Sequence, residues 1–341
     1  MAHPRIRCEG RPRERGVAHG EAARDLVREN IETYRLLLQR RFDVAWPAAR
    51  RHAAAFVPKI RAFDRALADE ITGIAEGARV DVRDIVLLNA RSSLTLTDGC
   101  TTFAALDAGL LAQNWDNLAR LRAVVLDIVA PDAPRILTLT EAGTLGKIGL
   151  NAEGVGVAVN GLHSLRPTTR GVPLFVVIRK ALTMPTLAEA MRVIGTTPKD
   201  GPHHYMVASR GHVGFSIEAL PSEFDVLRPS GPFLVHTNHY VSPRFVARPE
   251  CRLREPGSVL RFARAERLLA AQRAPIGVAE AKDVLSDHSD APASICSHAQ
   301  HASDVLAGET KCAVIMELGA GRMHVSEAHP CKSGLETFAL A

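Results

Sequence analysis

The sequence has few cysteines, few aromatic residues and no block of like charge, and each shortage argues against a class of protein. Six cysteines in 341 residues are too sparse for a disulfide scaffold and too widely spaced for a zinc-binding pattern; they are Cys8, Cys100, Cys251, Cys296, Cys312 and Cys331. Aromatic residues make up 5% of the chain and do not interleave with arginines, which argues against a nucleic-acid groove. We therefore expect reduced thiols, no bound metal ion and no nucleic-acid partner.

Signals for membranes and nucleotides are also missing. Residues 1–8 run into charged residues without an apolar stretch, so we expect neither a secretory signal nor a membrane anchor and predict a cytoplasmic protein. The patterns GxxxxGKS/T and HExxH do not occur, and residues 143–146 (Gly-Thr-Leu-Gly) are too short for a dinucleotide fingerprint. The sequence therefore predicts no resident cofactor.

What remains is the composition of an ordinary globular protein. Apolar residues make up 46% of the chain and charged residues 23%, with a mean hydropathy of +0.01. The net charge of +5 is spread along the chain, which makes it a weak signal for an anionic partner. The length suggests about two domains, although mixed chains of this size are often one compact unit.

Helical patterns dominate the first 95 residues. Apolar residues recur there at helical spacing in two segments, first Val27, Ile31, Tyr34 and Leu38, then Phe63, Leu67, Ile71 and Ile74. A third apolar segment covers residues 82–89. These segments predict a block of amphipathic helices.

From Cys100 onward the pattern changes to short apolar runs separated by turn residues. Such runs predict strands over residues 109–113, 124–129, 135–139, 154–159, 205–208, 212–219 and 233–236, and a hairpin over 312–326. Helical patterns return at residues 173–182, 186–194, 258–272 and 278–286. The chain thus begins with a block of helices and continues with strands that have pairs of helices between them. This order favours a layered α+β architecture over a doubly wound one.

The junction between the two patterns falls at Gly99 and Cys100. A cysteine thiolate is a good nucleophile when a base or a lowered pKa activates it. If the peptide bond before Cys100 were cut, its own α-amino group, with a reference pKa of ~7.7–8.0, could be that base. Glycine at 99 suits such a cleavage because it tolerates strained backbone angles. The alternative is that Cys100 is a small apolar residue at the start of a strand, and the residue types alone leave both interpretations open.

Seven motifs with matching order and separation point to one family. They are residues 98–102 (Asp-Gly-Cys-Thr-Thr), 113–116 (Gln-Asn-Trp-Asp), 140–143 (Thr-Glu-Ala-Gly), 146–151 (Gly-Lys-Ile-Gly-Leu-Asn), 160–163 (Asn-Gly-Leu-His), 165–168 (Leu-Arg-Pro-Thr) and 236–239 (His-Thr-Asn-His). The series resembles the acyl-coenzyme A:6-aminopenicillanic acid acyltransferase family, the cysteine peptidase family C45 of isopenicillin N acyltransferase. Residues 6–10, 15–20 and 294–296 extend the resemblance over most of the chain.

The resemblance implies a fold and a maturation step. The fold would be the four-layer αββα arrangement of the N-terminal nucleophile hydrolases, with antiparallel sheets sandwiched between helices. The precursor would cleave itself between Gly99 and Cys100. Residues 1–99 would form a mainly helical α chain that stays bound as a subunit, and residues 100–341 a β chain that carries the catalytic core.

The same resemblance implies roles for individual residues. Cys100 would be the nucleophile, and Asp116 would hold the α-ammonium group or orient the substrate, unless it only caps a turn. The side-chain amide of Asn238 and the backbone N–H of Gly161 would donate to the oxyanion that develops during attack.

Four further residues are predicted to bind substrate. Trp115 would line the acyl pocket and Thr102 would bond the amine or the attacking group, although core packing is an alternative for both. Asn160 and Ser294 complete the set, and Ser294 is otherwise a loop or capping serine. His236 and His239 flank Asn238 without a partner that a metal site would need, which favours structural roles for them.

Two departures from the family pattern concern the acceptor side. Ser297 and His298 follow residues 294–296 where the fungal enzyme has an arginine, and His203 and His204 precede a strand where a small hydroxyl residue is common. These departures argue against a β-lactam nucleus as the acceptor.

The predicted function is therefore transfer of an acyl group, through a Cys100 thioester, from a small-molecule amide or acyl-coenzyme A to water or an amine. Coenzyme A would be a substrate and not a cofactor, and the two fragments of the precursor would be each other's partners. The alternative is an unprocessed, catalytically silent binding or scaffold protein with the same fold.

Overall fold

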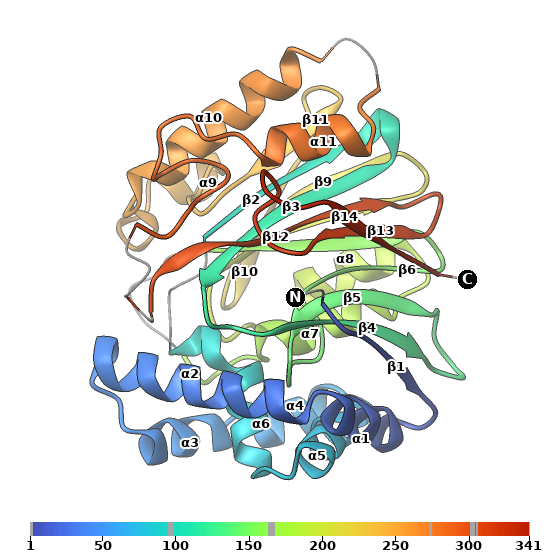
Figure 1. The fold of residues 1–341 in the computed structure, drawn as a ribbon, viewed down its shortest axis with the longest axis vertical. Helices are drawn as coiled ribbons and strands as arrows, with labels where there is room; N and C mark the ends of the chain where they lie inside the picture. Colours follow the sequence, from blue (N-terminus) through green and yellow to red (C-terminus); the bar gives the residue numbers. More distant parts are fainter. Residues whose placement is uncertain are drawn as a thin grey trace.

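The computed structural model describes residues 3–94, 99–162, 168–272, 275–300, 304 and 306–340. Several motif residues, namely Asp98, His163 and residues 165–167, lie outside the described residues. Figure 1 shows the elements stacked in four layers, with a sheet on a sheet and helices outside each. This arrangement confirms the predicted α+β, four-layer architecture.

The larger sheet has eight strands in the order β1-β4-β5-β6-β7-β8-β9-β10. The strands are β1 (Arg5–Glu9), β4 (Ala123–Val129), β5 (Ile136–Glu141), β6 (Ile148–Asn151), β7 (Val155–Gly161), β8 (His203–Ser209), β9 (Val213–Leu220) and β10 (Glu223–Leu227). All neighbours are antiparallel except β1 and β4, which run parallel. The first strand of the chain therefore forms one edge of this sheet.

The smaller sheet has six antiparallel strands in the order β11-β2-β3-β12-β13-β14. They are β2 (Gly99–Ala105), β3 (Leu110–Leu118), β11 (Phe233–His236), β12 (Gly308–Glu317), β13 (Arg322–Ser326) and β14 (Leu335–Ala339). Every residue of β3 is buried, and its alternate side chains enter different cores. Leu111 and Trp115 face the other sheet, whereas Leu110 and Ala112 face the outer helices.

Two groups of helices cover the outer faces of the sheets (Figure 1). The larger sheet is covered by α1 (Pro12–Ala22), α2 (Arg24–Phe42), α3 (Trp46–Ala54), α4 (Val57–Phe63), α5 (Arg65–Ala78), α6 (Val82–Asn89), α7 (Leu174–Leu182) and α8 (Leu187–Thr196). The smaller sheet is covered by α10 (Pro256–Ala270) and α11 (Val278–Leu285), and the short α9 (Pro243–Val246) precedes them. Each layer boundary is thus an apolar core.

Helices α1 and α5 approach each other unusually closely because glycines face backbone at their contact. A Cβ atom on Gly16 would lie 2.1 Å from the carbonyl oxygen of Glu70, and one on Gly20 would lie 2.2 Å from that of Ile74. Gly73 and Gly77 of α5 face α1 in the same way, at 2.2 and 2.3 Å from its carbonyl oxygens. Only residues without a Cβ permit this packing.

Most predicted elements occur where the patterns placed them, and α6 and β11 have the predicted bounds. The strand β1 was missed, because its charged residues alternate with only two buried apolar ones, Ile6 and Cys8. Residues 1–99 therefore contribute a strand to the larger sheet as well as helices. Among the described residues, none of the helices is long and apolar enough to span a membrane.

Candidate active site

Cys100 is the second residue of β2, and its side chain belongs to the core between the two sheets, where it is 1% exposed. Both backbone polar groups of Cys100 are bound by side chains from other segments. Its N–H donates to Asn238 Oδ1 at 2.9 Å, and its carbonyl oxygen accepts from Arg261 Nη1 at 2.7 Å. The backbone of the predicted nucleophile is thus held on both sides.

Gly99 lies directly opposite Asp116 in the β2–β3 pairing. A Cβ atom at position 99 would lie 2.9 Å from Asp116 Oδ2, so the carboxylate occupies the space that a side chain would need. Thr310 Oγ1 donates to Asp116 Oδ1 at 2.7 Å and fixes the other side of the carboxylate.

The side-chain amide of Asn238 is oriented by two donors. Its Oδ1 accepts from Cys100 N and from Arg261 Nη2, each at 2.9 Å, which leaves Nδ2 to donate to the carbonyl oxygen of Gly161 at 3.1 Å. The backbone N–H of Asn238 donates to Ser258 Oγ at 2.8 Å. The structure therefore brings Cys100, Asn238 and Gly161 together, with the carbonyl of Gly161 facing the amide.

Arg261 is a site residue that sequence reasoning missed. It lies on α10, is 7% exposed, and donates to Cys100 O, Asn238 Oδ1 and Thr101 Oγ1, the last at 3.2 Å. On this helix it shares the buried face with Ser258, Ala265 and Leu269. Arg261 recurs at helical spacing with the small and apolar residues of the buried face. This pattern could have identified it as a buried charged residue.

A cleft of ≈ 380 Å³ opens beside the junction. Its lining includes Gly99, Asp116, Asn238, Arg261 and Ser294. The hydroxyl of Ser294 donates to the carbonyl oxygen of Cys296 at 2.7 Å, so this serine also fixes the loop that forms one wall. The cleft is large enough for a small-molecule substrate.

Trp115 and Thr102 lie on the inner side of the smaller sheet and do not line this cleft. Trp115 is opposite Cys100 across β2 and β3, is fully buried, and has Lys147 Nζ 4.4 Å from its ring centroid. Thr102 is also fully buried, and its hydroxyl has no hydrogen-bond partner among the described residues. Both residues lie on the inner face of β2 and β3, which is also the face of the Cys100 side chain.

Asn160 belongs to a buried polar network that supports the segment before Asn238. Its Oδ1 is 2.7 Å from His204 Nδ1, and His204 Nε2 is 2.7 Å from Ser216 Oγ. The rings of His204 and His236 stack with centroids 3.5 Å apart. Burial, together with the charge of His236, holds the pKa of His204 well below its usual range.

His236 links this network to a buried carboxylate. Its Nε2 lies 2.9 Å from Glu218 Oε1 and its Nδ1 lies 2.9 Å from the carbonyl oxygen of Thr237. Nearby, His239 Nδ1 lies 2.8 Å from Ser258 Oγ, and burial lowers the pKa of His239 to about 4. Each of these histidines thus has a partner that fixes the loop around Asn238.

Comparison with known proteins identifies the chain's relatives. Residues 105–329 match the family described as acyl-coenzyme A:6-aminopenicillanic acid acyl-transferase. The 40 kDa form of acyl-coenzyme A:6-aminopenicillanic-acid-acyltransferase from Emericella nidulans is 30% identical over 253 residues, which cover 69% of this chain and 68% of that protein. The chain belongs to this family. The matched span begins after Cys100, so the role of Cys100 as nucleophile stays a prediction.

The solved structures that resemble this chain in fold are more distant from it in sequence. Penicillin V acylase from Agrobacterium tumefaciens matches 71% of this chain and 86% of its own, with a TM-score of 0.50 and 11% identity. An N-acylethanolamine-hydrolyzing acid amidase ortholog from Caenorhabditis elegans matches 71% of this chain and all of its own, with a TM-score of 0.47 and 17% identity. The fold is that of the N-terminal nucleophile hydrolases.

Proposed function

We propose that the chain is a self-processing cysteine amidohydrolase or acyltransferase whose nucleophile is Cys100. The observation that supports this most is the hydrogen bond of 2.9 Å between Cys100 N and Asn238 Oδ1. The preceding residue, Gly99, faces Asp116 on the neighbouring strand. Cleavage before Cys100 would turn this N–H into an α-amino group at the same position. Asn238 would then accept from the amine and hold it beside the thiol.

In the self-cleavage step, Cys100 Sγ attacks the carbonyl carbon of Gly99. The C–S bond forms, the Gly99–Cys100 peptide bond breaks, and the departing nitrogen takes a proton to become the α-amine. Water then hydrolyses the Gly99 thioester and releases two chains, residues 1–99 and 100–341. The carboxylate of Asp116, which lies against residue 99, would hold the new α-ammonium group.

In the mature enzyme the α-amine takes the proton of the Cys100 thiol, and the thiolate attacks the acyl carbonyl. The oxyanion would be bound by Gly161 N–H and by Asn238 Nδ2, which would exchange its present carbonyl partner for the substrate oxygen. The α-ammonium protonates the departing amine or coenzyme A thiol and leaves the acyl group on sulfur. Water or an acceptor amine then attacks this thioester.

The arginine Arg261 supports this chemistry as a positioning residue. By donating to Cys100 O and to Asn238 Oδ1 it fixes the nucleophile and the oxyanion donor relative to each other. Its positive charge would also strengthen the polarity of the Asn238 amide. Catalysis gains from such groups because they are oriented before the reaction begins.

The proposal is tested by trapping the acyl-enzyme. Purified protein is mixed with N-acyl amides and acyl-coenzyme A thioesters of graded chain length, quenched in acid and mapped by mass spectrometry. We expect one acyl group on Cys100, removed by neutral hydroxylamine, and none in Cys100→Ser. Cys312→Ala is the matched control, because this neighbouring thiol is fully buried and its pKa is raised to about 12 by burial. A folded chain that acquires no acyl group on Cys100 from any donor would support the silent scaffold instead.

A further inference from the structure

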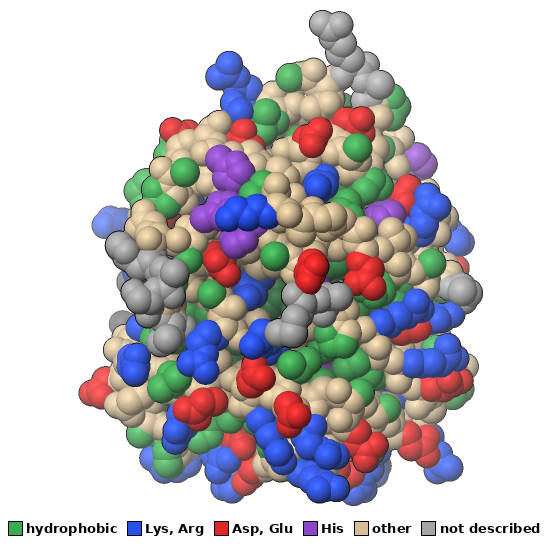
Figure 2. Space-filling model, in the orientation of Figure 1, with side chains coloured by type: hydrophobic (Ala, Val, Ile, Leu, Met, Phe, Trp, Pro, Cys, Tyr) green, Lys and Arg blue, Asp and Glu red, His purple; other side chains and the backbone are tan. Residues whose placement is uncertain are grey.

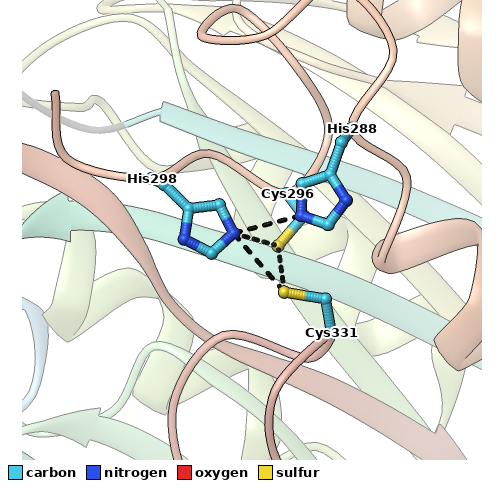
Figure 3. A group of neighbouring side chains, drawn as sticks. All are labelled: His288, Cys296, His298 and Cys331. Carbon is cyan, nitrogen blue, oxygen red and sulfur yellow. Dashed lines mark hydrogen bonds between the residues drawn. The ribbon is translucent and has the colours of Figure 1, made fainter.

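Four metal-ligating side chains converge beside the wall of the cleft. Figure 3 shows His288, Cys296, His298 and Cys331 pointing toward one another. Their ligand atoms all lie within 4.8 Å of one another. Three of the residues belong to the connection between α11 and β12, and Cys331 belongs to the connection between β13 and β14. Figure 2 shows histidine side chains gathered at one place on this face of the molecule, and His288 and Cys331 are exposed, so the group is reachable from solvent.

We propose that these four residues bind one zinc ion. Two thiolates and two imidazoles are the donor set of a closed, structural zinc site, and together they balance the charge of Zn²⁺. The set leaves no open position for a substrate or water. The site is thus distinct from the acyl-transfer chemistry and does not depend on it.

Four of the six distances between the ligand atoms are close to those of a tetrahedral zinc site. With Zn–S near 2.3 Å and Zn–N near 2.0–2.1 Å, tetrahedral ligands are separated by ~3.8 Å for S···S, ~3.6 Å for S···N and ~3.3 Å for N···N. Cys296 Sγ and Cys331 Sγ are 3.7 Å apart, His298 Nε2 is 3.7 and 3.4 Å from these two sulfurs, and the Nε2 atoms of His288 and His298 are 3.0 Å apart. The ligands need little movement to close on an ion.

The surrounding backbone holds the ligands in place. Cys296 N donates to the carbonyl oxygen of Asp287 at 2.9 Å, which keeps His288 beside the loop that carries Cys296. Arg264 Nη2 in turn donates to Asp287 Oδ2 at 2.7 Å. The ring of His298 stacks on His329, with centroids 4.0 Å apart. Metal sites depend on such supporting contacts, which orient the ligands before binding.

This proposal differs from the sequence-based expectation of no metal, which stays untested. That expectation rested on the linear spacing of the cysteines, whereas folding brings Cys331 to within 3.7 Å of Cys296. His298 also lies at one of the two departures from the family pattern.

The zinc site would brace one wall of the cleft. Ser297 lies between two of the ligands, and its backbone N–H donates to Thr310 Oγ1 at 2.9 Å. Thr310 Oγ1 donates to Asp116 Oδ1 at 2.7 Å, so a short chain of hydrogen bonds leads from the site to the carboxylate at the junction. Loss of the metal is expected to loosen this wall and raise KM more than it lowers kcat.

The test uses the full-length protein made without an affinity tag that binds metal. Elemental analysis is expected to find about one zinc per chain. Exchange with Co²⁺ should give the strong visible bands of a tetrahedral site and a thiolate charge-transfer band. Cys331→Ser and His288→Ala should each retain less than about a tenth of the metal, while His212→Ala, at another exposed histidine, should retain all of it.

Three results would overturn the proposal. They are wild-type protein that neither holds zinc nor gives the cobalt spectrum, equal metal content in Cys331→Ser, and a Cys296–Cys331 disulfide in protein purified under reducing conditions. The spectrum of the wild type keeps the test valid even if a variant fails to fold. Metal content measured in Cys100→Ala separates this proposal from the proposed function, since the site should fill equally without the nucleophile.

Discussion

At the scale of single residues, the centre of the site is the backbone of Cys100, which is held from both sides. Asn238 accepts from its N–H and Arg261 donates to its carbonyl oxygen. Arg261 also donates to Asn238, so the three residues form a closed ring of contacts. The position of the nucleophile therefore depends on one planar guanidinium group.

Replacing Arg261 by lysine tests this dependence. An ammonium group cannot donate in the plane to both oxygens, so we expect kcat/KM for acyl transfer to fall about 10- to 100-fold, the cost of one or two lost charged hydrogen bonds. Arg267→Lys, an exposed position on the same helix, is the control and should retain full activity. Equal activity in the two variants would contradict the positioning role, provided that their melting temperatures agree.

Sequence reasoning found the residues at the junction but not those that support them. Cys100, Asp116 and Asn238 stand in short motifs whose order is specific, and the structure brings them to one place. Arg261 and Thr310 stand in no motif, because their importance comes from contacts between segments distant in the chain. Trp115 and Thr102 were assigned to substrate binding, and the structure places them in the inner core, where that role stays a prediction.

At the scale of elements, the helices α1 and α5 form the tightest contact of the N-terminal part. Gly16 and Gly20 on one helix, and Gly73 and Gly77 on the other, are each four residues apart and therefore lie on one face. Each faces backbone at a distance that no Cβ could keep. The helices cannot separate to make room without disturbing the core beneath them.

We expect Gly20→Ala to destabilise the protein by about 2–3 kcal/mol, since overpacking against backbone has no flexible side chain to yield. Urea denaturation followed by circular dichroism measures this change. Gly319→Ala is the matched control, because a Cβ there meets nothing within 4 Å, and its free energy of unfolding should change little. A similar small effect at position 20 would show that the helices can readjust.

Several helices were predictable at this scale because their apolar residues recur at helical spacing, and several central strands because they are continuous apolar runs. The capping residue Thr186, whose Oγ1 accepts from Glu189 N at 3.3 Å, marks the start of α8 as expected. Three edge strands were not predicted, whereas β11, also at an edge, has the predicted bounds. β1 and β14 each carry three exposed residues and no residue of β10 is fully buried, so their sequences do not show the apolar runs that marked β3 and β7.

At the scale of the whole molecule, residues 1–99 are built into the rest of the chain. β1 extends the larger sheet by pairing with β4, and the helices share one core with β4, β5 and β7. His19 Nε2 accepts from the backbone N–H of Gly143 at 3.1 Å across this boundary. The α chain should therefore remain bound after cleavage.

His19 makes this boundary sensitive to acid. Burial lowers its pKa to about 3 from the usual value of 6.5, and the neutral ring is needed to accept from Gly143. The unfolded chain binds the proton first, so the stability contributed by His19 is present above pH 6.5 and is lost as the pH falls toward 3. The loss is on the order of 5 kcal/mol.

The check is chemical denaturation of wild type and His19→Gln between pH 4 and pH 7. Glutamine can accept the same hydrogen bond but does not titrate, so the difference in stability between the two proteins should shrink as the pH falls. Other buried histidines titrate in both proteins and cancel in this comparison. A difference that does not change with pH would contradict the role given to His19.

The central claim is that the chain cuts itself before Cys100, and the intact mass of the purified protein tests it most directly. We predict two fragments for the wild type, the larger beginning at Cys100, and one uncut chain for Cys100→Ala. Both fragments should elute together in size exclusion, because the layers interlock. A single full-length wild-type chain, or cleavage that persists in Cys100→Ala, would contradict the account.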